Sequence, residues 1–597
     1  MTYHSFDELN IGDIVLVPIV NREKEAIIIQ KVAKPSFNTL SIISKTSKFY
    51  SPKQLNLAKF ISQYYFSSLS MALGLFIPFS SNYQKLINLK RYKKPKLSPL
   101  QNRAYHQIVL KKRALLFGVT GSGKTEIFIS LMCDVLESGK NVIFLMPEIS
   151  LTPQMQKRLE RYFGKEVALW HSKITKNRKE EILKGMANGS IKIIAGAMSS
   201  LFVPFENLGL IIVDEEHDDS YKANSTPRYN ARDVAVLMAD RLGAKIVLAS
   251  ATPSISSYYK YDVVKLSKPY IQTKKKYKFI SGDKIDNKMI LSIHKHFKED
   301  NQSILFIPTR GNFKYLYCPS CGETHKCPYC SVGMALHRNH KYLKCHYCNF
   351  IEAIIDVCAS CQYSPLSNNR IGTVEAIDII KEAIPDIEIE QFDKDSITTI
   401  KKLKDTLKRF EDKESHLLVG TQMLSKGHDY ANITLSVIMG LDYILGLSDY
   451  RARERALSLL FQIAGRSGRA KEADIIIQSA NRDFFANYLR DYEDFIKDEL
   501  IALEMANYPP FVSLARVLVA HKKEQKGAGI VFDCVTKLKE FKNITIIGYG
   551  KAPIEKIANK FRFTILLKSK DRMELLKALH SVNSRDIEID FDPIDFS

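Results

Sequence analysis

Eight of the ten cysteines in this 597-residue chain form four closely spaced C-x-x-C pairs. The pairs are Cys318/Cys321, Cys327/Cys330, Cys345/Cys348 and Cys358/Cys361. Eight thiolates complete two tetrahedral Cys₄ sites and leave no open position for water, so we expect two structural Zn²⁺ ions. We expect the neighbouring histidines on the surface rather than among the ligands; they are His325, His337, His340 and His346. Cys133 and Cys534 lack such partners and are expected in hydrophobic cores.

A glycine-rich loop, G-V-T-G-S-G-K-T at 118–125, follows an apolar run and precedes a helical pattern. In such a loop Lys124 contacts the β- and γ-phosphates of ATP, and the Thr125 hydroxyl binds Mg²⁺. Gln101 precedes the loop and is a candidate for contact with adenine, although a helix-capping role is nearly as strongly favoured. The loop residues expected around the nucleotide are Gly118, Thr120, Gly121, Ser122, Gly123, Lys124 and Thr125.

An acidic motif and an arginine motif could complete ATP hydrolysis. An apolar strand at 210–213 runs into D-E-E-H, which places Asp214 to hold Mg²⁺ and Glu215 to act as base for the attacking water. A solvated acidic strand end becomes improbable once the phosphate loop lies upstream. In G-R-S-G-R, Arg466 and Arg469 could stabilise charge at the γ-phosphate, and a structural salt bridge is the alternative for one of them.

Alternating strand and helix patterns predict an α/β protein with two RecA-like parallel-sheet lobes. Short β-branched runs at 14–18 and 26–32 and helical spacing at 52–70 predict a small β-rich N-terminal module, and an α+β domain ends the chain. The cysteine block is expected just after the first strand of the second lobe. The predicted domains are 1–90 (N-terminal module), 91–99 (linker), 100–270 (lobe 1), 271–317 with 362–505 (lobe 2), 318–361 (zinc-binding insert) and 506–597 (C-terminal domain).

The balance of charge favours a polyanionic partner. The sequence holds 87 Lys+Arg against 65 Asp+Glu, a formal net charge of +22. The basic stretch at 90–96 is expected to be a linker, with a solvated face and a direct DNA contact about equally favoured. No apolar run reaches the roughly 20 residues that cross a bilayer, and the first residues lack a secretory pattern. We therefore expect a cytoplasmic protein without a membrane partner, in which paired cysteines favour zinc over disulfides.

The combined motifs resemble those of superfamily 2 helicases, and most closely the PriA family of primosomal replication-restart helicases. The resemblance covers about 100–597, and 1–90 only loosely. It is carried by the eight cysteines and by P-E-I-S-L-T-P-Q at 147–154, D-E-E-H-D-D-S-Y-K at 214–222, P-R-Y-N-A-R-D-V-A at 227–235, S-A-T-P-S at 250–254, G-T-Q-M-L-S-K-G-H-D-Y at 420–430, R-A-R-E-R at 451–455 and Q-I-A-G-R-S-G-R at 462–469.

This resemblance implies an ATP-dependent 3′→5′ DNA helicase that recognises abandoned or stalled replication forks and starts primosome assembly. Its implied partners are forked and single-stranded DNA, single-stranded DNA-binding protein and helicase-loading primosome proteins. It assigns 217–228 to a loop that links DNA contact to hydrolysis, including His217 and Arg228. Tyr221 and Tyr229 would stack on bases there, with packing against the lobe interface as the alternative. It also implies nested zinc sites, Cys318/Cys321/Cys358/Cys361 and Cys327/Cys330/Cys345/Cys348.

Two departures from the family pattern bear on DNA binding. The family has a winged-helix domain between its N-terminal module and lobe 1, and the span 77–96 leaves no room for one. The N-terminal module also lacks its opening segment, so we expect the natural start to lie upstream of Met1 and the pocket for a DNA 3′ end to be incomplete here.

Two other classes of function compete with a DNA helicase. A superfamily 2 RNA motor is disfavoured by the cysteine insert and the aromatic-rich segment. A non-enzymatic fork-binding scaffold is disfavoured because Lys124, Asp214, Glu215 and Arg466 are all present.

Overall fold

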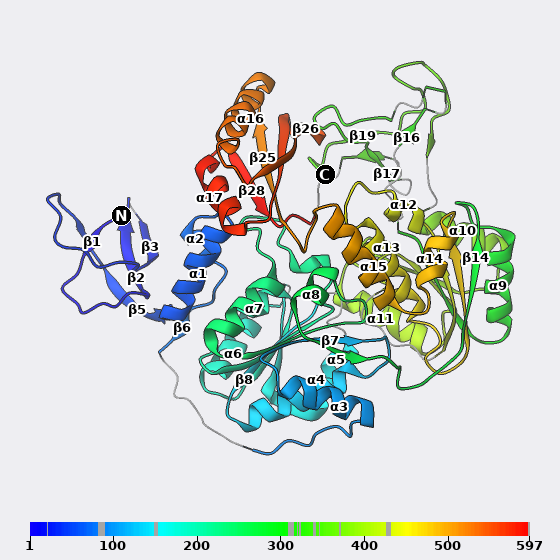
Figure 1. The fold of residues 1–597 in the computed structure, drawn as a ribbon, viewed down its shortest axis with the longest axis horizontal. Helices are drawn as coiled ribbons and strands as arrows, with labels where there is room; N and C mark the ends of the chain where they lie inside the picture. The colour runs from blue at the N-terminus through cyan, green and yellow to red at the C-terminus, as the bar shows by residue number, and fades with distance from the viewer. Residues whose placement is uncertain are drawn as a thin grey trace. The chain divides into compact units, whose positions relative to one another are not determined.

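The computed structural model describes residues 1–594 except 21, 82–89, 148–152, 173, 309–315, 319, 322–323, 338–341, 346, 369–371 and 426–431 (Figure 1). Its contacts divide the chain into two compact units. Unit 1 comprises 1–117, 123–250 and 261–266, and unit 2 comprises 118–122, 251–260 and 267–597. Among the described residues, no helix is both long and apolar enough to cross a membrane.

The N-terminal module of unit 1 contains a four-stranded sheet in the order β3-β2-β5-β6, with two helices between β5 and β6 in the chain. The predicted strand at 14–18 lies within β2, but the second predicted strand, at 26–32, is wrong. Antiparallel pairing with β2 places β3 earlier, over the exposed segment R-E-K-E-A-I, so its polar residues face solvent. The elements are β1 (Tyr3–His4), β2 (Asp13–Ile19), β3 (Arg22–Ile27), β4 (Leu40–Ser41), β5 (Ser44–Phe49), α1 (Pro52–Tyr64), α2 (Leu69–Leu73) and β6 (Phe79–Ser80).

Lobe 1 is a seven-stranded parallel sheet in the order β13-β7-β12-β11-β8-β10-β9. The apolar strand predicted at 210–213 lies within β11. The strands are β7 (Arg113–Gly118), β8 (Asn141–Leu145), β9 (Val167–Trp170), β10 (Ile193–Gly196), β11 (Leu208–Asp214), β12 (Lys245–Ser250) and β13 (Val263–Leu266). The helices are α3 (Pro99–Val109), α4 (Lys124–Glu137), α5 (Pro153–Phe163), α6 (Lys176–Ala187) and α7 (Ala231–Leu242).

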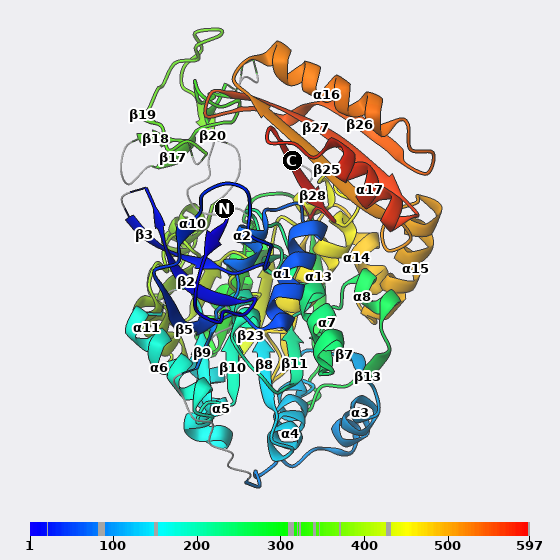
Figure 2. The same cartoon turned by 90° about the vertical axis from the view of Figure 1, so that its left-hand side faces the viewer.

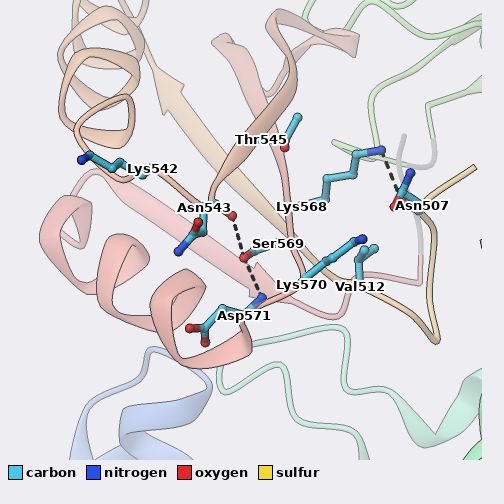
Figure 3. Close-up of a pocket in the computed structure, with 9 residues that line it drawn as sticks. All are labelled: Asn507, Val512, Lys542, Asn543, Thr545, Lys568, Ser569, Lys570 and Asp571. Atoms are coloured by element: carbon cyan, nitrogen blue, oxygen red, sulfur yellow. Dashed lines mark hydrogen bonds between the residues drawn. The ribbon is translucent and has the colours of Figure 1, made fainter.

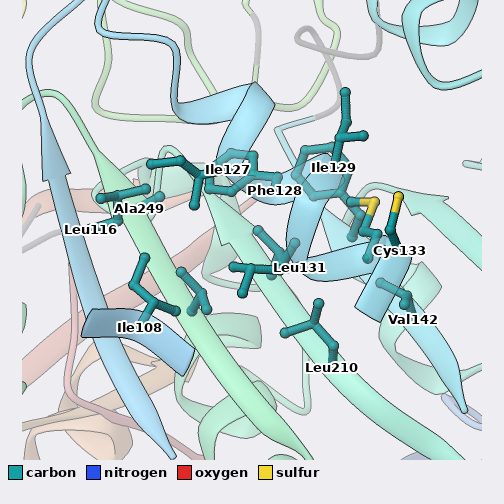
Figure 4. Packing of buried hydrophobic residues seen from close by; sticks show 14 of the residues in the cluster. Ile108, Leu116, Ile127, Phe128, Ile129, Leu131, Cys133, Val142, Leu210 and Ala249 are labelled. Carbon is teal, nitrogen blue, oxygen red and sulfur yellow. The ribbon is translucent and has the colours of Figure 1, made fainter. Parts of the chain in front are cut away.

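A dense apolar core joins α4 to one face of this sheet (Figure 4). Phe128 and Leu131 of α4 pack with Leu116, Leu210 and other strand residues that point to the same side. Cys133 lies in this core and is fully buried, as predicted for an unpaired cysteine. Helix α7 contacts β11 and β12 and covers the opposite face. The buried sheet therefore forms a rigid base for the loops at its carboxyl edge.

The basic stretch at 90–96 is mostly exposed, as expected for a solvated linker, but part of it is bound to lobe 1. The Tyr92 hydroxyl donates to Glu166 Oε2 (3.0 Å), and the Tyr92 backbone N–H donates to Glu137 Oε1 (2.9 Å). Lys90 forms an ion pair with Glu166 (2.8 Å), and Lys94 forms one with Asp134. Acidic side chains of lobe 1 thus neutralise part of this stretch. The span 77–96, which we expect to leave no room for a winged-helix domain, lies partly outside the described residues because it includes 82–89.

Lobe 2 is a six-stranded parallel sheet in the order β14-β24-β23-β15-β22-β21. Its strands are β14 (Lys275–Ile280), β15 (Gln302–Phe306), β21 (Ile389–Phe392), β22 (Leu417–Gly420), β23 (Ile433–Ile438) and β24 (Ala473–Gln478). Its helices are α9 (Asn287–Lys298), α10 (Thr373–Ala383), α11 (Ile400–Glu411), α12 (Leu441–Leu445), α13 (Ala452–Ala464), α14 (Arg482–Tyr488) and α15 (Tyr492–Met505). Helix α8 (Ile255–Lys260) belongs to the same unit. The expected position of the cysteine block is wrong by one strand. The first strand of lobe 2 is β14, which the sequence analysis did not predict because its sequence, K-K-Y-K-F-I, is rich in lysine. The cysteine block therefore follows the second strand of the lobe, β15.

The cysteine insert carries short strands, and a four-stranded sheet in the order β26-β27-β25-β28 forms the C-terminal domain (Figure 2). Helices α16 and α17 pack side by side on one face of this sheet. The insert at 318–361 contains β17 (Ala335–His337), β18 (Tyr342–Lys344) and β19 (Ile351–Ala353), and the short strands β16 (Leu316–Tyr317) and β20 (Ser367–Asn368) flank it. The C-terminal domain contains β25 (Ser513–His521), α16 (Glu524–Leu538), β26 (Thr545–Ile557), β27 (Lys560–Ser569), α17 (Arg572–Val582) and β28 (Ile587–Phe591). Cys534 is buried in α16, as predicted.

Candidate nucleotide and metal sites

The phosphate loop connects β7 to α4, as the sequence predicts. Gly121 and Gly123 have φ values of +77° and +80°, which glycine adopts without the strain of a side chain. Lys124 and Thr125 open α4, so the first backbone N–H groups of this helix face the loop. Free N–H groups and the helix dipole at such a terminus bind anions. The loop therefore has the local geometry of a phosphate site.

Gln101 supports this loop from α3. Its side chain accepts from the Ser98 backbone N–H (2.8 Å) in a capping box, and its Nε2 donates to the Gly123 carbonyl (3.3 Å). The residue is buried, with 3% of its surface exposed. The helix-capping alternative is thus confirmed, and contact with adenine stays a prediction.

The acidic motif lies at the carboxyl end of β11, on the same sheet edge as the phosphate loop. Only β12 separates β11 from β7. The Glu215 backbone N–H donates to Asp214 Oδ1 (3.0 Å), and Glu215 adopts a left-handed φ of +47°. Non-glycine residues in this region are strained and gather at functional sites. Within the described part of the chain, Glu215 Oε2 is buried without a hydrogen-bond partner, 3.7 Å from His217 Nδ1. This oxygen is suited to receive the proton of a water molecule.

His217 joins the acidic motif to the end of β12. Its Nδ1 lies 2.7 Å from the Ser250 hydroxyl, the first residue of S-A-T-P-S. Glu216, the residue before His217, is buried and forms an ion pair with Arg232 of α7 (3.2 Å). His217 therefore links the acidic motif to the end of β12.

The two tyrosines of the expected DNA-coupling loop are interior residues. Tyr221 is 2% exposed, and its hydroxyl donates to the Asp214 carbonyl (2.7 Å). Tyr229 is 5% exposed and packs edge-on against Phe202. Base stacking needs an open ring face, which neither tyrosine offers in this structure, so stacking by Tyr221 and Tyr229 stays a prediction. Arg228, which lies between the two tyrosines in the sequence, is half-buried. Its role in coupling stays a prediction.

The arginine motif follows α13 in unit 2 and is held by β14. Lys275 Nζ donates to the carbonyl of Ala464, the last residue of α13 (2.7 Å), and the Gly468 backbone N–H donates to the Ile433 carbonyl (3.0 Å). Arg466 is buried and donates to the Ser425 carbonyl. Burial, and then Arg469 and Arg466, lower the pKa of Lys275 to about 8. Lys275 is thus a third cation beside the two arginines. The sequence analysis did not single it out, because it lies in a run of lysines.

The titration of Lys275 predicts a pH-dependent affinity for ATP. Lys275 is charged below pH 8 and loses this charge above pH 8. Because the sequence predicts that Arg466 and Arg469 bind the γ-phosphate, we expect the charge of Lys275 to add to their attraction for it. We expect the KM for ATP to rise between pH 7 and 9.5, on the order of tenfold for the loss of one partly screened charge. Lys275→Met should give the high KM at all these pH values. Lys276→Met is the control, because Lys276 is exposed and paired with Glu472 (3.3 Å). A parallel pH profile in Lys275→Met would contradict the assignment.

The eight paired cysteines form two separate clusters. The outer cluster holds Cys318, Cys321, Cys358 and Cys361, and the inner cluster holds Cys327, Cys330, Cys345 and Cys348. This is the nested pairing that the family resemblance implied. Sγ atoms lie 3.4 Å apart for Cys318/Cys361, 3.7 Å for Cys321/Cys358 and 3.6 Å for Cys327/Cys348.

The clusters fit tetrahedral zinc. With Zn–S bonds of about 2.3 Å, the edge of the sulfur tetrahedron is about 3.8 Å, close to the observed separations. Backbone N–H groups of Cys361 and Ser360 lower the pKa of Cys358 to about 7, which favours the thiolate form that binds metal. His325 contacts Glu352 and belongs to neither cluster, as expected. His340 and His346 lie outside the described residues, as does the side chain of His337.

A lysine-lined cavity of about 420 Å³ opens on the C-terminal domain (Figure 3). Lys542, Lys568 and Lys570 line it together with Asn507 and Asp571. Lys568 Nζ donates to the Asn507 carbonyl (3.3 Å), and the Ser569 hydroxyl donates to the Asn543 carbonyl (2.8 Å), so loop and sheet are held together around the cavity. The surplus of lysines suits an anion.

Five known domain families match successive parts of the chain. The matches are 3′DNA-binding domain (3′BD) at 1–78, DEAD/DEAH box helicase at 98–260, PriA DNA helicase Cys-rich region (CRR) domain at 327–352, Helicase conserved C-terminal domain at 354–471 and Primosomal protein N C-terminal domain at 504–594. A replication restart protein PriA of Helicobacter pylori is 40% identical over 612 residues, covering 100% of this chain and 97% of that protein.

The chain belongs to the PriA family. A PriA of Rickettsia conorii is 34% identical and covers 96% of this chain and 92% of its own length. A PriA of Borreliella burgdorferi is 32% identical, with coverages of 92% and 89%. With both helicase domains, this PriA-family chain is an ATP-dependent DNA helicase with zinc-binding cysteine clusters. The match over 1–78 also places the N-terminal module in the family, which the sequence resemblance reached only loosely.

Proposed function

We propose that this chain is a 3′→5′ DNA helicase that binds stalled or abandoned replication forks and initiates primosome assembly. The observation that carries the proposal is the combination of a 3′ DNA-binding domain with a two-lobed motor in one chain. A motor alone would translocate on any single strand. A module for DNA ends gives the motor a place to begin at a fork.

In this proposal the motor residues divide the work of hydrolysis. Lys124 binds the β- and γ-phosphates, Thr125 and Asp214 hold Mg²⁺, and Glu215 accepts the proton of the attacking water. Arg466 and Arg469 stabilise the charge that develops on the transferred phosphoryl group. Gln101 secures the phosphate loop, and contact of its side chain with adenine is part of the proposal.

DNA affinity in this proposal comes mainly from phosphate contacts spread over a basic protein. The net charge of +22 and the lysine-lined cavity of the C-terminal domain support this view. Counterion release then makes binding strongly salt-dependent. The proposed protein partners are single-stranded DNA-binding protein and helicase-loading primosome proteins.

The proposal is tested with three DNA substrates of equal length. Duplexes with a 3′ or a 5′ single-stranded tail report direction, and a fork with a leading-strand 3′ end reports structure preference. We expect unwinding from the 3′ tail and a higher ATPase rate with the fork than with blunt duplex. Equal unwinding of the 5′-tailed duplex would refute the direction, and equal ATPase rates with fork and duplex would refute fork recognition.

Changing Cys327 to Ser should separate hydrolysis from strand separation. The inner cluster lies in the insert, away in sequence from the hydrolytic residues, and its metal supplies local folding energy. The purified variant should hold one zinc ion instead of two, keep DNA-stimulated ATPase and lose unwinding. Cys534→Ala is the control, because Cys534 is buried in α16 and binds no cluster. A Cys327→Ser protein that retains two zinc ions would contradict the ligand set.

A further inference from the structure

The inner zinc cluster receives a hydrogen bond from a distant part of the chain. The Ala558 backbone N–H donates to Cys330 Sγ at 3.3 Å, although 228 residues separate them. The other cysteines with described backbone donors obtain them locally. Cys327 receives N–H groups from Tyr329 and Cys330, and in the outer cluster Cys358 receives those of Ser360 and Cys361.

Ala558 lies at the tip of the β26–β27 hairpin of the C-terminal domain, and the whole tip is bound to the cysteine insert. Lys556 and Ser331 exchange two hydrogen bonds: the Ser331 N–H donates to the Lys556 carbonyl, and the Lys556 N–H donates to the Ser331 hydroxyl, both at 2.9 Å. The Asn559 N–H donates to the Tyr329 carbonyl (3.1 Å). Ile557 packs on the apolar cluster around the inner cysteines.

The turn itself is shaped for this contact. Ile557 pairs with Lys560, so Ala558 and Asn559 form a two-residue loop, and their φ values are +47° and +61°. Such a loop needs left-handed residues at both positions; asparagine adopts this conformation readily, and alanine does so under strain. The alanine N–H that the turn presents is the one that reaches the sulfur.

We propose that the β26–β27 hairpin is part of the inner zinc site, so that zinc retention by this cluster and order of the hairpin tip are linked. Four thiolates on one Zn²⁺ carry excess negative charge, and an N–H donor to one sulfur offsets part of it. Groups that contact the ligands in this way change metal affinity by about 10- to 100-fold. The outer cluster, held by donors within the insert, should be independent of the hairpin. The inference rests on zinc occupancy, not on the proposed role at forks.

Two variants remove the contact in the full-length protein without changing a cysteine. Ile557→Asp places a charge against the apolar cluster, and Ala558→Pro removes the N–H that faces Cys330. Ile547→Asp is the matched control, because Ile547 lies on the same strand and is 40% exposed. Ala558→Gly is the second control, since glycine keeps the N–H and suits the positive φ.

The readout is zinc release to a chromogenic chelator, followed by mass spectrometry of alkylated cysteines. In Ile557→Asp and Ala558→Pro, one of two zinc ions should leave 10- to 100-fold faster than in the unchanged protein, and Cys327, Cys330, Cys345 and Cys348 should be alkylated first. Both controls should release zinc at the unchanged rates. Unchanged release in both test variants would overturn the proposal. Equal acceleration of loss from both clusters, by 10- to 100-fold, would also overturn it, because the hairpin would then act on the fold as a whole.

Discussion

Lys124→Ala should reduce ATP hydrolysis by about a hundred- to a thousandfold, the effect of removing one preorganised contact to developing charge. Lys124 opens α4 directly after the left-handed Gly123, and the phosphate loop offers no second lysine. DNA binding should remain nearly unchanged, because affinity for a polyanion is distributed over many basic side chains.

The measurement pairs a steady-state ATPase assay with fork binding at fixed salt. Lys184→Ala is the control, since Lys184 is an exposed lysine of α6 in the same lobe. Near-normal hydrolysis by Lys124→Ala would remove the phosphate-loop assignment. Loss of DNA binding together with hydrolysis would indicate a folding defect, which the circular dichroism spectrum of the variant would reveal.

Glu215→Gln should trap bound ATP instead of preventing its binding. Glutamine preserves the size of the side chain but cannot accept a proton, and loss of a general base lowers the rate by about 10²- to 10⁴-fold. The buried Glu215 Oε2 in this structure has no described hydrogen-bond partner to lose, so the fold should tolerate the change. Binding of a fluorescent ATP analogue should persist while phosphate release stops.

The control for Glu215→Gln is Glu180→Gln, an exposed glutamate of α6 in the same lobe. Both proteins should bind nucleotide with similar affinity, and only Glu180→Gln should release phosphate at the normal rate. A Glu215→Gln protein that hydrolyses ATP normally would exclude Glu215 as the base. In that case the motif's other acids, beginning with Asp214, would have to be tested.

Buried features were the most predictable from sequence. The strands β7, β8, β10, β11 and β12 are recognisable as apolar runs, because parallel strands buried on both faces consist almost entirely of apolar residues. Strand β14 escaped detection because it forms the edge of its sheet, and its alternate lysines reach solvent and acidic partners such as Glu472 and Asp474. Lys275, which faces inward from this strand, was missed for the same reason.

Residue types alone could not decide between roles that depend on burial. Tyr221 and Tyr229 have the chemistry for base stacking, and only the fold places both rings in the interior. Gln101 has the chemistry for adenine, and only the geometry reveals its bonds to Ser98 and Gly123. The contact between Ala558 and Cys330 uses a backbone N–H, which no sequence pattern could reveal.

The nesting of the two cysteine clusters gives zinc loading an order. The outer cluster must bring together Cys321 and Cys358, which are 37 residues apart. Once the inner cluster has closed, the free chain between them is roughly half as long, and halving a loop saves about 0.6 kcal/mol of closure entropy. Metal bound at the inner site therefore raises the affinity of the outer site by roughly threefold without any contact between the ions. Refolding from the metal-free chain should fill the inner site first, and the two sites should load with positive cooperativity.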